Sequence, residues 1–155
     1  MRLFHYTVGL WLRKIIEDKQ IKGEDEKWLL PAMKPVVWFT MKPSWEETAN
    51  KDLLSNGKRM ELDRDETEIM GEGLFRIEVN PIAAPYRWRD YPSVSEGNRR
   101  LARGLYRTAR KVWSRPEVEW RFSLKPVGIE HWLCIEKWNG EKWEAMIGWK
   151  GGESK

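Results

Sequence analysis

The sequence predicts one α+β domain over residues 1–155, with split, mostly antiparallel β-sheets and two or three helices. Three observations predict this class. A chain of 155 residues has room for one domain only. Several short segments alternate apolar and polar residues or are β-branched, as strands are, whereas few segments have helical spacing. Most of these strands follow one another late in the chain, which argues against a doubly wound α/β fold.

Two strand–helix pairs are predicted in the first third of the chain. Residues 3–7 are apolar and aromatic, which is typical of a strand, and residues 10–21 then have the spacing of an amphipathic helix. Residues 36–40 are β-branched and aromatic, which predicts a buried strand. A serine and a glutamate with the spacing of a capping box then predict a helix over residues 45–51.

The rest of the chain predicts strands around one long helix. Residues 55–73 are polar, acidic and interrupted by glycine, so we expect an exposed loop with one strand at most. Helical spacing predicts a helix over residues 97–113. Asn139-Gly140 is typical of a hairpin turn. Strands are predicted at residues 74–79, 120–124, 132–138 and 143–147.

Composition narrows the class of protein. Apolar residues make up 41% of the chain and charged residues 34%, which suits a folded domain and not a membrane protein. The single cysteine, Cys134, excludes an internal disulfide and a cysteine-based zinc cluster, and the two histidines have no ligand spacing, so no metal is expected. We therefore expect a cytoplasmic protein without a membrane partner. The net charge of +4 is compatible with an anionic partner.

Two spaced motifs in the first 50 residues carry a functional signal. The first is His5-Tyr6-Thr7 at the end of a predicted strand, with Ile15-Ile16 on the helix that follows. The second is the strand at residues 36–40, followed by Glu47-Thr48-Ala49-Asn50. Together they resemble the NAD-binding core of the ADP-ribosyltransferase superfamily. The resemblance is to the diphtheria-toxin-type branch, with its poly-ADP-ribose polymerases, DarT toxins and RNA 2′-phosphotransferases.

This resemblance implies an ADP-ribosyltransferase-like fold, NAD as a substrate, and a macromolecular target that is a nucleic acid or a protein. His5 would contact a ribose, Thr7 would help to hold the dinucleotide, and Tyr6 would offer its backbone to the carboxamide. Trp38 or Trp45 would face the nicotinamide, because a flat cationic ring binds an aromatic face. The implied NAD-binding residues are His5, Tyr6, Thr7, Trp38, Thr40 and Trp45.

The carboxylate that such a reaction needs is not fixed by the resemblance. Breaking the bond between nicotinamide and ribose passes through an oxocarbenium-like transition state, which a carboxylate stabilises. Glu130, at the start of the predicted strand 132–138, is our first choice, with His5 as the second catalytic residue. Glu119 and Glu46 are the alternatives, and each of the three is otherwise a solvated surface acid.

A basic helix is the second functional signal. Residues 97–115 contain no acidic residue, and four arginines spaced four, four and three residues apart form one stripe: Arg99, Arg103, Arg107 and Arg110. Because arginine is the preferred side chain for phosphate contacts, the stripe is interpreted as a binding ridge for nucleic acid, a nucleotide or an acidic protein. The alternative interpretation is that the stripe pairs with the acidic segment 61–72 or is simply solvated.

Three functions stay open at this point. The first is an NAD-dependent ADP-ribosyltransferase. The second is a non-catalytic nucleotide- or nucleic-acid-binding module on the same fold. The third is an interaction or inhibitor protein that presents a basic face rich in tryptophan, of which the chain has 11. A toxin or defence role is compatible with all three.

Overall fold

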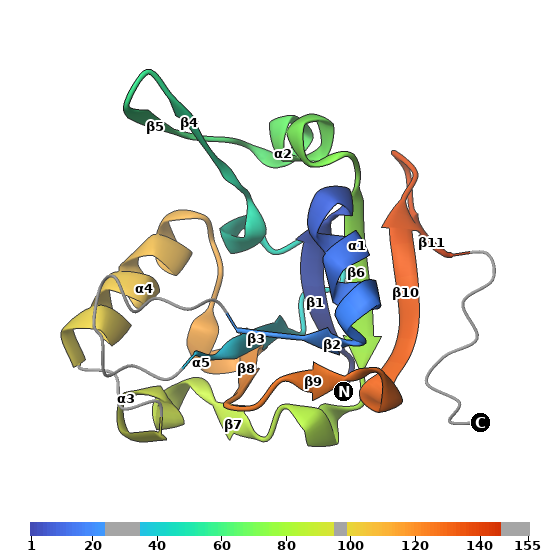
Figure 1. Cartoon of the computed structure of the whole chain (residues 1–155). Helices are drawn as coiled ribbons and strands as arrows, with labels where there is room; N and C mark the ends of the chain where they lie inside the picture. The colour runs from blue at the N-terminus through green and yellow to red at the C-terminus, as the bar shows by residue number, and fades with distance from the viewer. Residues whose placement is uncertain (24–34, 95–98, 147–155) are drawn as a thin grey trace.

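The computed structural model in Figure 1 describes residues 1–23, 35–94 and 99–146, and it has the predicted α+β class. Seven strands form one sheet in the order β11-β10-β6-β1-β3-β8-β7, and neighbouring strands in it run antiparallel. These strands are β1 (Leu3–Val8), β3 (Val37–Thr40), β6 (Leu74–Val79), β7 (Tyr86–Arg87), β8 (Trp120–Ser123), β10 (Trp132–Trp138) and β11 (Trp143–Ala145). Two small sheets pair β2 (Gln20–Ile21) with β9 (Val127–Gly128), and β4 (Asp52–Ser55) with β5 (Lys58–Glu61).

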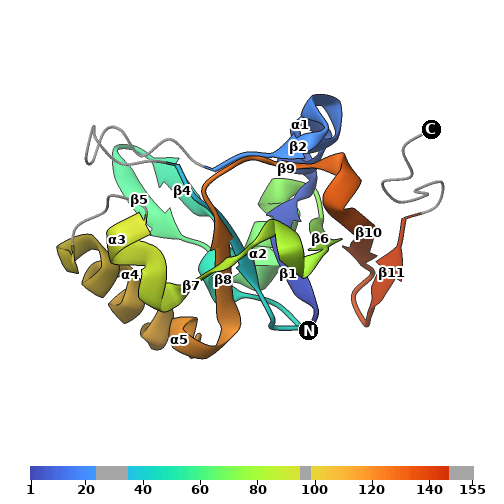
Figure 2. The same cartoon turned by 90° about the horizontal axis from the view of Figure 1, so that it is seen from below.

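The helices gather in two places. In Figures 1 and 2 the helices α3, α4 and α5 lie at the side of the molecule where β7 and β8 are found, whereas α1 and α2 lie beside β1 and β6. The helices are α1 (Gly9–Asp18), α2 (Arg64–Gly71), α3 (Tyr91–Val94), α4 (Arg99–Lys111) and α5 (Pro116–Glu119). Single 3₁₀ turns are η1 (Glu47–Ala49), η2 (Pro81–Ala83), η3 (Trp88–Asp90) and η4 (Ile129–His131). No helix in the described ranges is long and apolar enough to span a bilayer.

The first strand supplies side chains to two different faces of the sheet. Successive residues of a strand point to opposite sides, so Phe4, Tyr6 and Val8 pack with Trp45 in one cluster, while Leu3 belongs to the larger core. β1 pairs with β3, with Phe4 opposite Thr40. The two strands that carry the sequence motifs therefore lie side by side.

The prediction of an exposed loop over residues 55–73 is wrong. The hairpin β4–β5 and the helix α2 occupy this region. A capping box starts α2, because Asp63 accepts from the backbone of Glu66 and Glu66 accepts from the backbone of Asp63. At its other end a Cβ on Gly71 would lie 2.5 Å from the Cβ of Val8, so glycine lets α2 lie directly against β1. Helical spacing was not evident because the buried residues of this short helix are Thr67 and Gly71, and neither is a large apolar residue.

Two helix boundaries also differ from the prediction. The helix expected over residues 45–51 is only the turn η1, and Glu46, not Ser44, caps it by accepting from the backbone N–H of Thr48. The helix expected over residues 10–21 ends at Asp18, because Lys19 is left-handed with φ 54° and β2 follows. Parts of two expected elements, residues 97–98 and residue 147, lie outside the described ranges.

Candidate functional site

A cleft of about 600 Å³ is lined by residues of β1, β3, α1, β8 and α4 and of the segment around η1. Its volume is in the range of pockets that bind small molecules. Both sequence motifs contribute to the lining, since His5 and Thr7 come from β1 and Trp38 and Thr40 come from β3. The structure therefore brings together five of the six implied NAD-binding residues, all but Trp45, and with them Glu46, one of the three candidate carboxylates.

His5 is half-buried in the wall of the cleft and is held by the neighbouring strand. Its Nδ1 lies 3.0 Å from the carbonyl oxygen of Trp38. A carbonyl can only accept, so Nδ1 carries the proton and Nε2 is left as an acceptor. Burial is the main reason that the pKa of His5 falls to about 4, and the nearby positive charge of Lys51 lowers it further. At neutral pH the ring is therefore uncharged and suited to accept a hydrogen bond.

The depressed pKa of His5 predicts a loss of stability in acid. The unfolded chain binds a proton at His5 near pH 6.5, whereas the folded protein resists it down to about pH 4. The free energy of unfolding therefore keeps this contribution in full above pH 6.5 and loses roughly 3 kcal/mol as the pH falls to 4. The variant His5→Asn, which keeps a donor for the Trp38 carbonyl, is expected to lose this pH-dependent component. Urea unfolding at pH 7 and pH 4.5 measures it, and equal pH dependence of the variant and the native protein would contradict it.

Glu46 is a buried carboxylate in the wall of the cleft, with 5% of its surface exposed. Its Oε2 accepts hydrogen bonds from Thr40 Oγ1 at 3.0 Å and from Trp120 Nε1 at 3.2 Å. Its Oε1 accepts from Thr48 Oγ1 at 3.0 Å, from the Thr48 backbone N at 3.4 Å, and from Ser114 Oγ. This one side chain therefore connects β3, η1, β8 and the segment between α4 and α5.

Thr40 takes part in the network around Glu46. Its hydroxyl donates to Glu46, and the same oxygen accepts from the backbone N of Lys42 at 3.1 Å. Thr40 therefore supports Glu46. It also lines the cleft, and its contact with a dinucleotide stays a prediction.

Aromatic rings form another part of the wall. Trp38 is half-buried, with its ring centroid 5.1 Å from that of Tyr91 and 5.2 Å from that of Trp120. All three residues line the cleft. Such a wall can hold a flat aromatic group by stacking or edge contacts. Of the two tryptophans named as alternatives, Trp38 is the one that lines the cleft.

Trp45, the alternative to Trp38, does not line the cleft. It is buried in the cluster on the other face of the sheet, where its ring lies 5.1 Å from that of Tyr6. The side chain of Tyr6 is also on that face, because it alternates with His5 and Thr7 along β1. Burial is the main reason that the pKa of Tyr6 rises to about 12. The backbone contact expected of Tyr6 stays a prediction.

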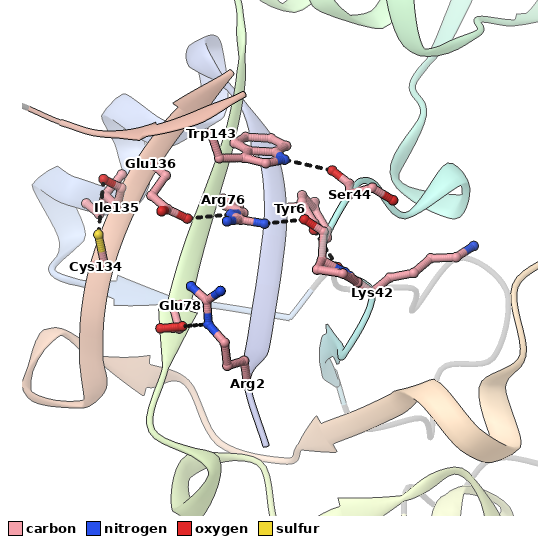
Figure 3. Close-up of polar contacts among 11 residues, drawn as sticks. Arg2, Tyr6, Lys42, Ser44, Arg76, Glu78, Cys134, Ile135, Glu136 and Trp143 are labelled. Atoms are coloured by element: carbon pink, nitrogen blue, oxygen red, sulfur yellow. Dashed lines mark hydrogen bonds and ion pairs between the residues drawn. The ribbon is translucent and has the colours of Figure 1, made fainter. Parts of the chain in front are cut away.

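On that second face, three side chains hold three consecutive carbonyls of the segment that leads to Glu46 (Figure 3). Tyr6 Oη donates to the carbonyl of Lys42 at 2.5 Å, and Trp143 Nε1 donates to that of Ser44 at 2.8 Å. Arg76 donates to the carbonyl of Pro43, between them. We call these three donors, Tyr6, Arg76 and Trp143, the carbonyl clamp. Because the clamped residues come from 42–44, the clamp fixes the chain just before Glu46.

The other two carboxylate candidates do not line the cleft. Glu130 is in η4, at the start of β10, and β6 and β1 separate β10 from β3 in the sheet. Its side chain is 62% exposed and lies 3.7 Å from His131. Glu119 lies next to the end of β3, since its carbonyl accepts from the backbone N of Met41, but its carboxylate accepts from the backbone N of Arg115. Of the three candidates only Glu46 lines the cleft.

The rim of the cleft contains residues that the sequence reasoning missed. Trp11 of α1 is 60% exposed and lines the cleft together with Ile15, one turn further along the helix. Lys14 and Lys22 also line it, and both pair with Asp18, at 3.1 and 3.4 Å. The signal that was available for Trp11 is its position four residues before Ile15 of the first motif, which places both on one face of a helix.

All four arginines of the predicted stripe are exposed on α4: Arg99, Arg103, Arg107 and Arg110. Within the described residues none of them forms an ion pair with a carboxylate. The acidic segment 61–72 lies mainly in α2, and its Glu72 pairs with Arg13 of α1 at 3.8 Å. The interpretation that the stripe pairs with this segment is therefore wrong for the described residues.

Comparison of the chain with protein-family models, curated proteins and solved structures finds no match. The resemblance to ADP-ribosyltransferases therefore rests on the two sequence motifs alone. In the described ranges no three His, Cys, Asp or Glu side chains cluster as a metal site requires.

Proposed function

We propose that the cleft binds NAD and that the protein transfers ADP-ribose from it to a macromolecule. One observation carries this proposal: His5, Thr7, Trp38 and Glu46 line the same cleft of about 600 Å³. The neutral Nε2 of His5 accepts a hydrogen bond from a ribose hydroxyl, and the aromatic wall holds the nicotinamide ring. The lysines at the rim favour the negative charge of the diphosphate.

In the proposed reaction the bond between the nicotinamide nitrogen and ribose C1′ breaks, and its electron pair leaves with nicotinamide. A nucleophile of the target then forms a bond to C1′ and releases its proton to water. Positive charge develops on the ribose, and Glu46 is a buried carboxylate in the wall of the cleft that can stabilise it. His5, with a pKa of about 4, serves as a binding contact and not as the base that takes the proton.

A second function, nucleotide binding without turnover, is favoured by the contacts of Glu46. A carboxylate offers about four acceptor positions. Five hydrogen bonds from four residues already use them: Thr40, Thr48, Ser114 and Trp120. A substrate hydroxyl has to displace one of these donors before it reaches Glu46. If none is displaced, the cleft binds its nucleotide and does not turn it over.

Thermal shift with NAD and with ADP-ribose tests binding. A ligand at about 100 times its Kd adds about 2.7 kcal/mol of stability, which raises the Tm of a chain of this size by about 5–10 °C. His5→Asn is expected to reduce the shift, because it removes the Nε2 acceptor. His131→Asn is the matched control, since His131 does not line the cleft.

Three outcomes are distinguishable. A shift together with release of nicotinamide, measured by chromatography, supports transfer or hydrolysis. A shift without nicotinamide release supports the binding module. The absence of a shift with both ligands, or an equal loss of shift in the two histidine variants, would reject a nucleotide site at His5.

A further inference from the structure

The C-terminal end of α4 carries an exposed tryptophan in a backbone conformation that favours glycine. Trp113 has φ 66° and is 82% exposed. The backbone N of Ser114 donates to the carbonyl of Ala109 at 2.9 Å, and the backbone N of Trp113 donates to the carbonyl of Arg110 at 3.2 Å. These two hydrogen bonds define a helix ending in which glycine usually occupies the position of Trp113. A left-handed conformation costs stability for a bulky side chain, and an exposed indole adds little to the core. Neither the backbone nor packing explains a tryptophan here, and such outliers are frequent at functional sites.

The helix that leads to Trp113 presents a continuous basic surface. Its exposed cations are Arg99, Arg100, Arg103, Arg107, Arg110 and Lys111. The helix contains no acidic residue. Like charges at helical spacing repel one another, so this surface is suited to a polyanion.

We propose that α4 and Trp113 bind a single-stranded nucleic acid, with phosphates along the arginines and an unpaired base stacked on Trp113. A helix rises 1.5 Å per residue, so Arg99, Arg103 and Arg107 follow one another at about 6 Å along the axis. This is comparable with the spacing of successive phosphates along one strand. Every nucleotide of a single strand offers a flat base to the indole, whereas the acidic side chains of a protein satisfy the arginines alone and a duplex keeps its base faces stacked inside.

The position of α4 connects this surface to the cleft. Leu105 lines the cleft, and it faces the opposite side of α4 from Arg103 and Arg107, because residues two apart in a helix point in nearly opposite directions. A strand on the arginines therefore lies across α4 from the proposed NAD site. The role of the strand as a target of ADP-ribose transfer rests on the proposed function. Binding of the strand is measured without NAD, so this test can fail or succeed independently of the proposed function.

Fluorescence anisotropy with labelled oligothymidylate and oligouridylate of about 12 nucleotides tests the proposal, with a duplex of the same length for comparison. Both single strands are expected to bind more tightly than the duplex, and the preference between them identifies DNA or RNA as the better ligand. The slope of log K against log salt is expected to be about −0.7 for each phosphate contact. Polyglutamate added as a competitor tests the acidic-protein alternative.

Two variants measure separately what the arginine charges and the Trp113 ring contribute to binding. Reversing Arg103 and Arg107 to Glu is expected to weaken binding at least tenfold and to reduce the magnitude of the salt slope by about 1.4. Trp113→Gly is expected to weaken binding about tenfold while raising the Tm, because glycine fits the left-handed conformation without the cost. A loss of binding in a stabilised variant cannot come from unfolding. The control reverses two exposed lysines outside α4, Lys58 and Lys142, and is expected to change binding less.

Each of the remaining results would overturn the proposal. If neither single strand binds at about 50 mM salt, a nucleic acid is excluded as the ligand of α4. Equal binding of the duplex with no effect of Trp113→Gly shows a purely electrostatic contact. Displacement by polyglutamate at equal charge concentration, again without an effect of Trp113→Gly, assigns the ridge to an acidic protein.

Discussion

Arg76→Leu is expected to lower the free energy of unfolding by about 3–5 kcal/mol. The Arg76 side chain is 6% exposed and donates to Glu136 at 2.5 Å and to the carbonyl of Pro43 (Figure 3). Its guanidinium also lies over two rings, 4.2 Å from the centroid of Phe4 and 4.8 Å from that of Trp143. The variant leaves a largely buried carboxylate and a carbonyl without their donor, which costs more than the ion pair itself contributes. Urea unfolding at pH 7 measures the loss.

Two further variants identify the source of this loss. Arg59→Leu breaks the ion pair with Asp52, but the Arg59 side chain is 73% exposed, so the loss is expected to stay within about 1 kcal/mol. Adding Glu136→Leu to Arg76→Leu is expected to recover part of the stability, because the unpaired carboxylate is gone. If Arg76→Leu and Arg59→Leu cost the same, the carbonyl clamp does not hold the segment 42–44.

The parts of the fold that the sequence predicted are those where a local pattern and the tertiary environment agree. β1, β3, β6 and β10 are strands with β-branched, aromatic or alternating side chains, and they form the middle of the sheet. The helix α2 was missed because it has few apolar residues, although the Asp63 and Glu66 of its capping box were a local signal. Residues 45–51 had a helix-start pattern, but only the single turn η1 forms there, with Glu46 as its cap.

The candidate site was predictable as far as the two motifs reach. His5, Thr7 and Trp38 were placed at one cleft because adjacent strands carry them. The carboxylate could not be placed in the same way. Ser114 and Trp120, two of the donors to Glu46, are 68 and 74 residues away along the chain, so only the folded chain identifies their acceptor. Glu130 was favoured because it begins a late strand, but strand order in the sheet puts β10 three positions from β3.

Glu46→Leu is expected to lower the free energy of unfolding by about 3–5 kcal/mol, and Glu46→Gln by about 1–3 kcal/mol. Leucine leaves the indole N–H of Trp120 and the hydroxyl of Ser114 without their acceptor, and Ser114 is fully buried. Glutamine replaces one acceptor oxygen by an NH₂ group. Either orientation of the amide sets that NH₂ against an N–H that can only donate, at Trp120 or at the Thr48 backbone.

The same substitution tests the role of Glu46 in chemistry, with Glu130→Gln as the matched control. Where the native protein releases nicotinamide from NAD, Glu46→Gln is expected to lower the rate about 100-fold or more while the Tm shift with NAD persists, because the carboxylate acts on charge that develops only in the transition state. Glu130→Gln changes an exposed carboxylate and is expected to alter stability by less than about 0.5 kcal/mol and to leave the rate unchanged. A fall in rate with Glu130→Gln and none with Glu46→Gln would return the catalytic role to η4. It would then require a rearrangement that brings Glu130 across β6 and β1 to the cleft, since the sheet order separates them.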